Sequence, residues 1–212
     1  MHLRRDDGAY EKVPYFCLPA AELATGVIAP SCLACYDYAN GLADLVVGYM
    51  GVPLDAKTPM TRHRGYLTVR NARGAEMLAA AGAALELSPT ESRPGLLLSR
   101  AMLAWQTTLA DDEAKSGGAP PAGAPRWLGE ILATLLTWLG PSGLEFAAYS
   151  IDYHALRNWI HCRRHWGAER ADAHVPPSAK LIVAEYDAEG AVSARAALAA
   201  PFPGARLGEG RE

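Results

Sequence analysis

The sequence predicts an α+β fold: a small mixed β/α region that carries a Cys-x-x-Cys turn, followed by a helical C-terminal segment. Short runs rich in β-branched and aromatic residues, typical of strands, lie before residue 70. After residue 126, apolar residues recur at spacings of three and four, which is typical of helices. Between these patterns, the segment 116–125 is so rich in Gly and Pro that regular structure cannot continue through it. We therefore expect a domain at 1–115, a linker at 116–126, a helical segment at 127–190 and a loose tail at 191–212.

The N-terminal domain is expected to begin with half of a β-hairpin. A turn at residues 6–8 leads into a predicted strand at 13–18, and the partner strand is expected to be missing from the chain. Two further strands are expected at 45–49 and 65–69. An Ala-rich helix is predicted at 75–87, whereas the apolar segment 96–109 fits either a helix or a strand.

The C-terminal segment is expected to form helices at 127–139, 144–166 and 178–186. The second of these has one continuous apolar face, made of Leu144, Ala148, Ile151, Ala155, Trp159, Cys162 and Trp166. Its opposite face is polar and gathers Ser150, Tyr153, Arg157, His161 and Arg164. That polar face is either solvated, as is common for such stripes, or lines a cofactor or substrate cleft. Four tryptophans are expected to form the core between these helices, namely Trp127, Trp138, Trp159 and Trp166.

Composition excludes several classes of protein. The formal net charge of −3 provides no basic surplus to neutralise phosphates, so no nucleic-acid partner is expected. The longest apolar run, 127–139, is interrupted by Gly129 and Glu130 and is shorter than the roughly 20 residues of a transmembrane helix. The first residues resemble neither a secretory signal nor a transit peptide. The sequence also lacks a Gly-rich phosphate-binding loop and a dinucleotide-binding fingerprint.

Cys32 and Cys35 are the residues that point most directly to chemistry. Two thiolates separated by two residues can bind one metal centre from a single turn of backbone. A 4Fe-4S cluster, a zinc site, a redox dithiol and a pair of inert buried thiols all remain open at this stage. Cys17 is either a third ligand or a small core residue, and Cys162, on the apolar face of the predicted helix 144–166, is expected to be core.

Several longer stretches resemble a known family. They are VPYFCLPAAEL, IAPSCLACYDYANGLADLVVGYMGVP, YLTVRNARGAEML and GLEFAAYSIDYHALRNWI. The signature Cys-x-x-Cys-x-Asp, then Ala-Asp and Gly, is that of the deazaflavin-coenzyme hydrogenase and dehydrogenase beta subunits, and it is matched by Cys32, Cys35, Asp37, Ala43, Asp44 and Gly48. DYANGLADLVVGYMG and SIDYHALRNW resemble the branch of that family that acts on chlorophyll. The resemblance covers roughly residues 2–187.

The resemblance implies a chloroplast enzyme with FAD and 4Fe-4S clusters that takes electrons from reduced ferredoxin. Its substrate would be 7-hydroxymethyl chlorophyll a, which is reduced to chlorophyll a. Cys32, Cys35 and Cys17 would be cluster ligands. Family members carry an additional N-terminal half with more cysteines, so this chain is expected to need that half or a partner subunit. Self-association is a further option. No catalytic or flavin-binding residue is assigned. Two alternatives are an electron-transfer module for another acceptor and a non-catalytic fragment that binds a metal or a partner.

Overall fold

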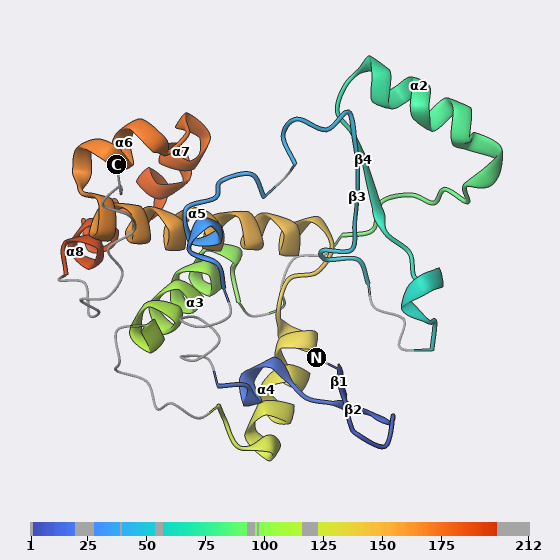
Figure 1. Ribbon diagram of the computed structural model, residues 1–212, viewed down its shortest axis with the longest axis horizontal. Helices are drawn as coiled ribbons and strands as arrows, with labels where there is room; N and C mark the ends of the chain where they lie inside the picture. Colours follow the sequence, from blue (N-terminus) through green and yellow to red (C-terminus); the bar gives the residue numbers. More distant parts are fainter. Residues whose placement is uncertain are drawn as a thin grey trace, which may run out of the picture.

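The α+β prediction is confirmed by the computed structural model, which describes residues 2–19, 28–38, 40–53, 57–92, 96, 98–115 and 123–198 (Figure 1). Its strands are β1 (His2–Arg4), β2 (Tyr10–Lys12), β3 (Leu45–Gly48) and β4 (Tyr66–Val69). Its α-helices are α2 (Ala72–Ala81), α3 (Arg100–Lys115), α4 (Arg126–Leu139), α5 (Leu144–Trp166), α6 (Ala168–His174), α7 (Pro177–Tyr186) and α8 (Ala191–Ala197). Short 3-10 helices are η1 (Tyr15–Cys17), η3 (Pro30–Leu33), η4 (Met60–Arg62) and η5 (Gly82–Ala84).

The first hairpin is complete within the chain, which corrects the expectation of a missing partner strand. β1 pairs antiparallel with β2, and the Asp7 carboxylate closes the turn by accepting from the Ala9 N–H at 2.9 Å. The predicted strand at 13–18 is wrong. Pro14 has no N–H to offer a ladder, and the chain turns into η1 directly after it.

The second hairpin confirms the two strands expected near 45–49 and 65–69, because β3 pairs antiparallel with β4. The helix expected at 75–87 begins earlier, since the Asn71 side chain caps α2 by accepting from the Gly74 N–H at 3.0 Å. It also ends earlier, at Ala81, where the chain continues into η5. Asn71 also donates to Asp44 at 2.6 Å, beside β3. Gly74 is buried here, and a Cβ would lie 2.1 Å from the Asp44 carbonyl oxygen. α2 therefore packs directly against the hairpin.

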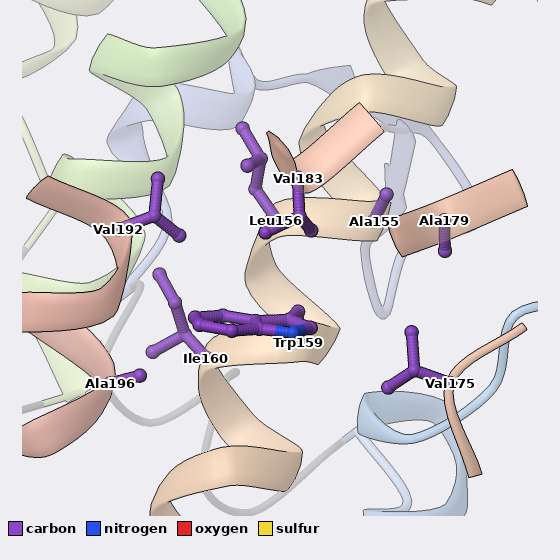
Figure 2. Close-up of a cluster of buried hydrophobic side chains, with 9 residues drawn as sticks. All are labelled: Ala155, Leu156, Trp159, Ile160, Val175, Ala179, Val183, Val192 and Ala196. Atoms are coloured by element: carbon purple, nitrogen blue, oxygen red, sulfur yellow. The ribbon is translucent and has the colours of Figure 1, made fainter. Parts of the chain in front are cut away.

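The main hydrophobic core surrounds α5, the longest helix (Figure 1). Leu156 and Val192 are fully buried at the contact between α5 and α8, and Trp159 and Ile160 continue the cluster one turn further along α5 (Figure 2). The complete buried cluster is Ala155, Leu156, Trp159, Ile160, Val175, Ala179, Val183, Val192 and Ala196. The segment that fitted either helix or strand, 96–109, contributes to α3, which packs along α5.

The predicted domain boundaries remain a prediction, because most of the linker, 116–122, lies outside the described residues. Two observations bear on them. α3 precedes the linker and α5 follows it, yet the two helices pack together. The first part of the expected loose tail forms α8, which buries Val192 and Ala196.

Two expectations about the helical segment need correction. Trp127 and Trp138 do not join the core, because they are 64% and 66% exposed on the outer face of α4. On α5 the expected apolar face is buried only from Ala155 onward, while Leu144 and Ile151 are exposed. The polar face is not a solvated surface, since Ser150 and the Arg164 side chain are buried and Tyr153, Arg157 and His161 are half-buried. None of the helices in the described ranges has the length and apolar character needed to span a bilayer.

Candidate metal-binding turn

Cys32 and Cys35 lie on one tight turn and both are exposed. The backbone N–H of Cys32 donates to the Ala29 carbonyl at 2.9 Å, and the N–H of Ala34 donates to Ser31 at 3.2 Å, which winds the chain through η3. The turn therefore presents two thiols to the outside from neighbouring positions. This donor set fits two of the four thiolate positions that an iron-sulfur cluster or a structural zinc ion takes.

The backbone of this turn is attached to the helices behind it. The Asn158 amide, on α5, donates to the carbonyl oxygens of Cys32 at 3.2 Å and Cys35 at 2.6 Å. His174, at the end of α6, bonds through Nε2 to the Ala34 carbonyl at 2.7 Å. All three contacts bridge more than a hundred residues of sequence, so the C-terminal helices hold the turn in place.

A third attachment is apolar. Ala34 is buried against Cys162 and Ala171, and the rings of Tyr36 and Trp166 pack around that contact. Burial raises the pKa of the Cys162 thiol to about 11, and the Tyr36 hydroxyl opposes that shift in part. Cys162 is thus a neutral, fully buried thiol behind the turn, as expected for a core residue.

Aromatic and basic side chains of α5 flank the other end of the turn. The Tyr38 hydroxyl donates to the His154 carbonyl at 3.2 Å, and the two rings lie 4.7 Å apart. Burial raises the pKa of Tyr38, with the Arg157 guanidinium opposing and the Cys35 thiol adding to the shift. Arg157 lies over the ring of Tyr153 at 5.4 Å. Two members of the predicted polar stripe, Tyr153 and Arg157, therefore do lie beside the cysteine turn.

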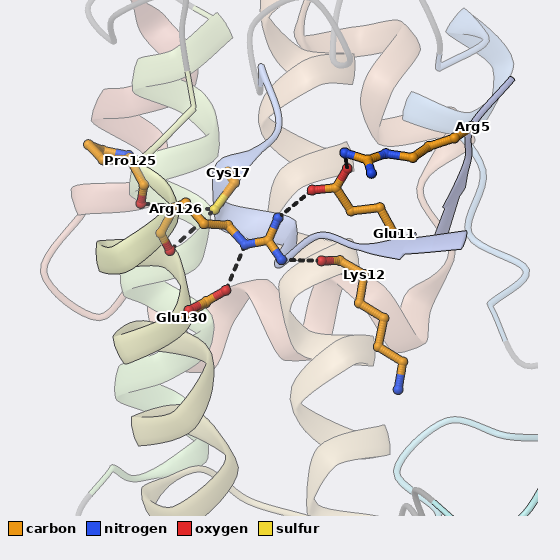
Figure 3. A network of polar contacts seen from close by, with 7 residues as sticks. All are labelled: Arg5, Glu11, Lys12, Cys17, Pro125, Arg126 and Glu130. Carbon is orange, nitrogen blue, oxygen red and sulfur yellow. Dashed lines mark hydrogen bonds and ion pairs between the residues drawn. The ribbon is translucent and has the colours of Figure 1, made fainter. Parts of the chain in front are cut away.

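Cys17 has a different setting (Figure 3). Its sulfur lies 4.0 Å from the carbonyl oxygens of Pro125 and Arg126, at the start of α4. It also fills the space beside Gly129, where a Cβ would lie 2.3 Å from the sulfur. Within the described residues, no group of three or more His, Cys, Asp or Glu side chains is arranged to hold a metal ion. The role of Cys17 as a third ligand stays a prediction.

Arg126 secures this contact between the first hairpin and α4 (Figure 3). Its guanidinium donates to Glu11 at 2.9 Å and to the Lys12 carbonyl at 2.5 Å, both at the end of the hairpin. It also donates to Glu130 at 2.6 Å, one turn further along α4. Cys17 is therefore held where the hairpin meets α4.

Another member of the polar stripe, Arg164, has a structural role in the described chain. It donates to both oxygens of Asp112, at 2.7 and 3.1 Å, across the α3–α5 contact. Arg195 of α8 adds a contact to Asp112 at 3.2 Å. This buried ion cluster joins three helices.

Sequence reasoning missed Asn158 and His174. Asn158 follows Arg157 on the long helix, and its side chain cannot be assigned to the turn from helical periodicity alone. His174 forms no metal-ligand spacing with other histidines, so no local pattern singles it out. A separate cavity of about 620 Å³ lies between β4, η4 and residues 86–91, with Arg62 and Arg64 among its lining side chains.

Comparison with known proteins first shows a resemblance to a protein family. Residues 6–93 match the family described as the C terminus of the coenzyme F420 hydrogenase/dehydrogenase beta subunit. This stretch includes both cysteines of the turn, and the predicted resemblance is confirmed.

Individual relatives then narrow the comparison. The chain is 53% identical over 192 residues to the "7-hydroxymethyl chlorophyll a reductase, chloroplastic" of Oryza sativa subsp. japonica, covering 91% of this chain and 40% of that protein. It is 38% identical over 186 residues to an uncharacterised protein of Nostoc sp. strain PCC 7120, covering 88% of this chain and 42% of that protein. The chain thus spans about two fifths of the length of each relative.

Proposed function

We propose that this chain is part of an iron-sulfur flavoprotein reductase of the chloroplast that converts 7-hydroxymethyl chlorophyll a to chlorophyll a. The observation that carries the proposal is 53% identity to a chloroplastic reductase of that name over nearly the whole chain. At that level of identity over 192 residues, a shared fold and a shared chemistry are the simplest account. The exposed Cys32 and Cys35 on an anchored turn are the chemical feature that supports it.

The reaction defines what the site must deliver. Replacing the hydroxyl of a hydroxymethyl group by hydrogen consumes two electrons and two protons and releases water. We propose reduced ferredoxin as the electron donor. A 4Fe-4S cluster supplies one-electron transfer and FAD supplies the two-electron step, so together they match a one-electron donor to a two-electron reduction.

In this proposal the chain's own residues hold a cluster. Cys32 and Cys35 would provide two thiolates, and a 4Fe-4S cluster needs four ligands. The other ligands would come from Cys17 or from the part of the protein that the relatives have in addition. Cys162 would not contribute, because it is fully buried and burial raises its thiol pKa to about 11.

The test is anaerobic co-expression of this chain with the remainder of the rice relative, followed by iron, zinc and flavin analysis and a visible spectrum. The proposal predicts brown protein with iron and flavin, and turnover of 7-hydroxymethyl chlorophyll a with reduced ferredoxin. Cys32→Ala and Cys35→Ala should lose iron, whereas Cys162→Ala is the control that should retain it. Iron and flavin without pigment turnover would indicate an electron-transfer module for another acceptor. Zinc or no metal in every sample would contradict the proposal.

A further inference from the structure

We propose that Asn158 is the positioning residue of the cysteine turn, and that its one amide group sets the geometry in which Cys32 and Cys35 receive a metal. The inference rests on the proposed function, because it assigns a task to a residue that touches neither the metal nor the substrate. The amide carries two N–H donors, and each one is used on the carbonyl of a different cysteine.

The orientation of this amide is fixed by a neighbour. Arg157 donates through Nε to the Asn158 Oδ1 atom at 2.9 Å. A guanidinium can only donate, so the oxygen of the amide must face Arg157 and the NH₂ group must face the turn. If the Asn158 amide were flipped by half a turn, its NH₂ group would face the Nε–H of Arg157. Its Oδ1 atom would then face the two carbonyl oxygens of Cys32 and Cys35. Arg157 therefore leaves Asn158 a single productive orientation.

Burial makes this arrangement costly to break. Asn158 is fully buried in the middle of α5. The buried amide would incur a desolvation penalty if it lost its partners, and this penalty exceeds the net gain of making an ordinary hydrogen bond. The carbonyls of Cys32 and Cys35 are therefore tied to one rigid point of the helix, and the spacing of the two cysteines follows from it.

His174 supports the same turn from a second helix. Because the Ala34 carbonyl can only accept, Nε2 of His174 is the donor in their 2.7 Å contact. Cys32, Ala34 and Cys35 thus have their carbonyls held by two side chains of the C-terminal helices, which leaves the two thiols as the exposed groups of the turn. Side chains that orient metal ligands in this way typically contribute about 10- to 100-fold to metal affinity.

The experiment compares Asn158→Leu with wild type in the full chain, purified reduced and without oxygen. The matched control is Ile160→Ala, a buried residue of the same helix that loses packing in the core cluster but whose apolar side chain cannot hydrogen-bond to the turn. Two probes are used. Co²⁺ titration follows cobalt-thiolate absorption, and phenylarsine oxide, which bonds to two neighbouring thiols with loss of water, reports the dithiol geometry without any metal.

Asn158→Leu is expected to weaken both probes about tenfold or more, while Ile160→Ala binds both like wild type. Equal binding by Asn158→Leu and wild type would overturn the inference and leave the proposed function standing. Failure of wild type to bind Co²⁺ would count against the proposed function, and the arsenical alone would then decide the role of Asn158.

A second pair of variants covers the case in which Asn158→Leu does not fold. His174 is an exposed residue at the end of α6, and its ring also lies 5.8 Å from that of Tyr36 and 5.0 Å from that of Trp166. His174→Ala should weaken arsenical binding by a factor of about three, and His174→Gln, which keeps a donor, should restore part of it. Identical binding by His174→Ala, His174→Gln and wild type would contradict the positioning of the turn by these helices.

Discussion

Asp112→Ala should be one of the most destabilising single substitutions in the helical part of the molecule. Asp112 and the Arg164 side chain are only 7% and 5% exposed, and they form a two-pronged ion pair at 2.7 and 3.1 Å. Arg195 adds a third contact at 3.2 Å. Removing the carboxylate leaves a buried guanidinium without its counter-charge, which typically costs about 3–5 kcal/mol. That is a large part of the roughly 5–15 kcal/mol that stabilises a typical domain.

The assay is urea unfolding followed by circular dichroism and tryptophan fluorescence. Glu113→Ala is the matched control, because Glu113 pairs with the same Arg195 at 2.9 Å but is 59% exposed. An exposed pair contributes about 0–1 kcal/mol, so this control should unfold near the wild-type midpoint. The double variant Asp112→Leu with Arg164→Met should recover most of the loss, since it replaces the buried charges by apolar groups of similar size.

The same assay reports on domain organisation, because Asp112 lies on α3, before the predicted linker, and its partners lie after it. If α3 and α5–α8 form one cooperative unit, Asp112→Ala should shift both signals together. A loss below about 1 kcal/mol would refute the reasoning, because the cluster would then behave like an exposed ion pair.

Three further predictions concern other parts of the fold. Gly129→Ala should lower the free energy of unfolding in urea by about 1–3 kcal/mol, because the added Cβ would lie 2.3 Å from the Cys17 sulfur. If that contact is the cause, adding Cys17→Ala should restore stability. Burial acts to raise the pKa of Asp187, but hydrogen bonds from Ser193 and Val192 hold it below its ordinary value. The stability that this charge contributes is therefore present above the ordinary pKa of Asp and is lost as pH falls through the lowered pKa of Asp187. Wild type and Asp187→Asn should converge in stability between about pH 5 and pH 2. A difference in stability that stays constant over this range would contradict the prediction. Iodoacetamide at about pH 8 should label Cys32 and Cys35 rapidly, whereas the buried Cys162 should react only on unfolding, as followed by mass spectrometry. Equal labelling rates for the three cysteines would show that Cys162 is accessible.

Local patterns in the sequence predict much of the fold. The two strands of the second hairpin and the long helix are predictable because their periodicity is a property of neighbouring residues. The first hairpin is not, because the predicted strand at 13–18 includes Pro14, which has no N–H for a ladder, and the strand that pairs lies before it at Tyr10–Lys12. The turn at residues 6–8 is predicted correctly, yet the three-residue strand on its N-terminal side is too short to carry an alternating pattern.

The burial of polar residues could not be predicted in the same way. Periodicity places Arg164 on a polar face of its helix, but the carboxylate that makes burial of Arg164 acceptable lies 52 residues earlier on α3. Likewise, nothing local distinguishes the buried Trp159 from Trp127 and Trp138, which stay exposed because no described element covers that face of α4. Such outcomes depend on which elements meet, and this is set by contacts between distant segments.

The cysteine turn depends on a local sequence pattern and also on contacts with distant segments. These contacts determine which part of the chain is needed to hold the turn. Cys32 and Cys35 are visible from spacing alone, and the matching family region, 6–93, contains them both. The side chains that hold the turn, Asn158 and His174, lie far beyond residue 93. A fragment that ended near residue 115 would keep both thiols and lose every one of these contacts, so the turn would no longer have a fixed backbone. The structural unit that fixes the backbone of this turn is therefore the turn together with α5 and α6.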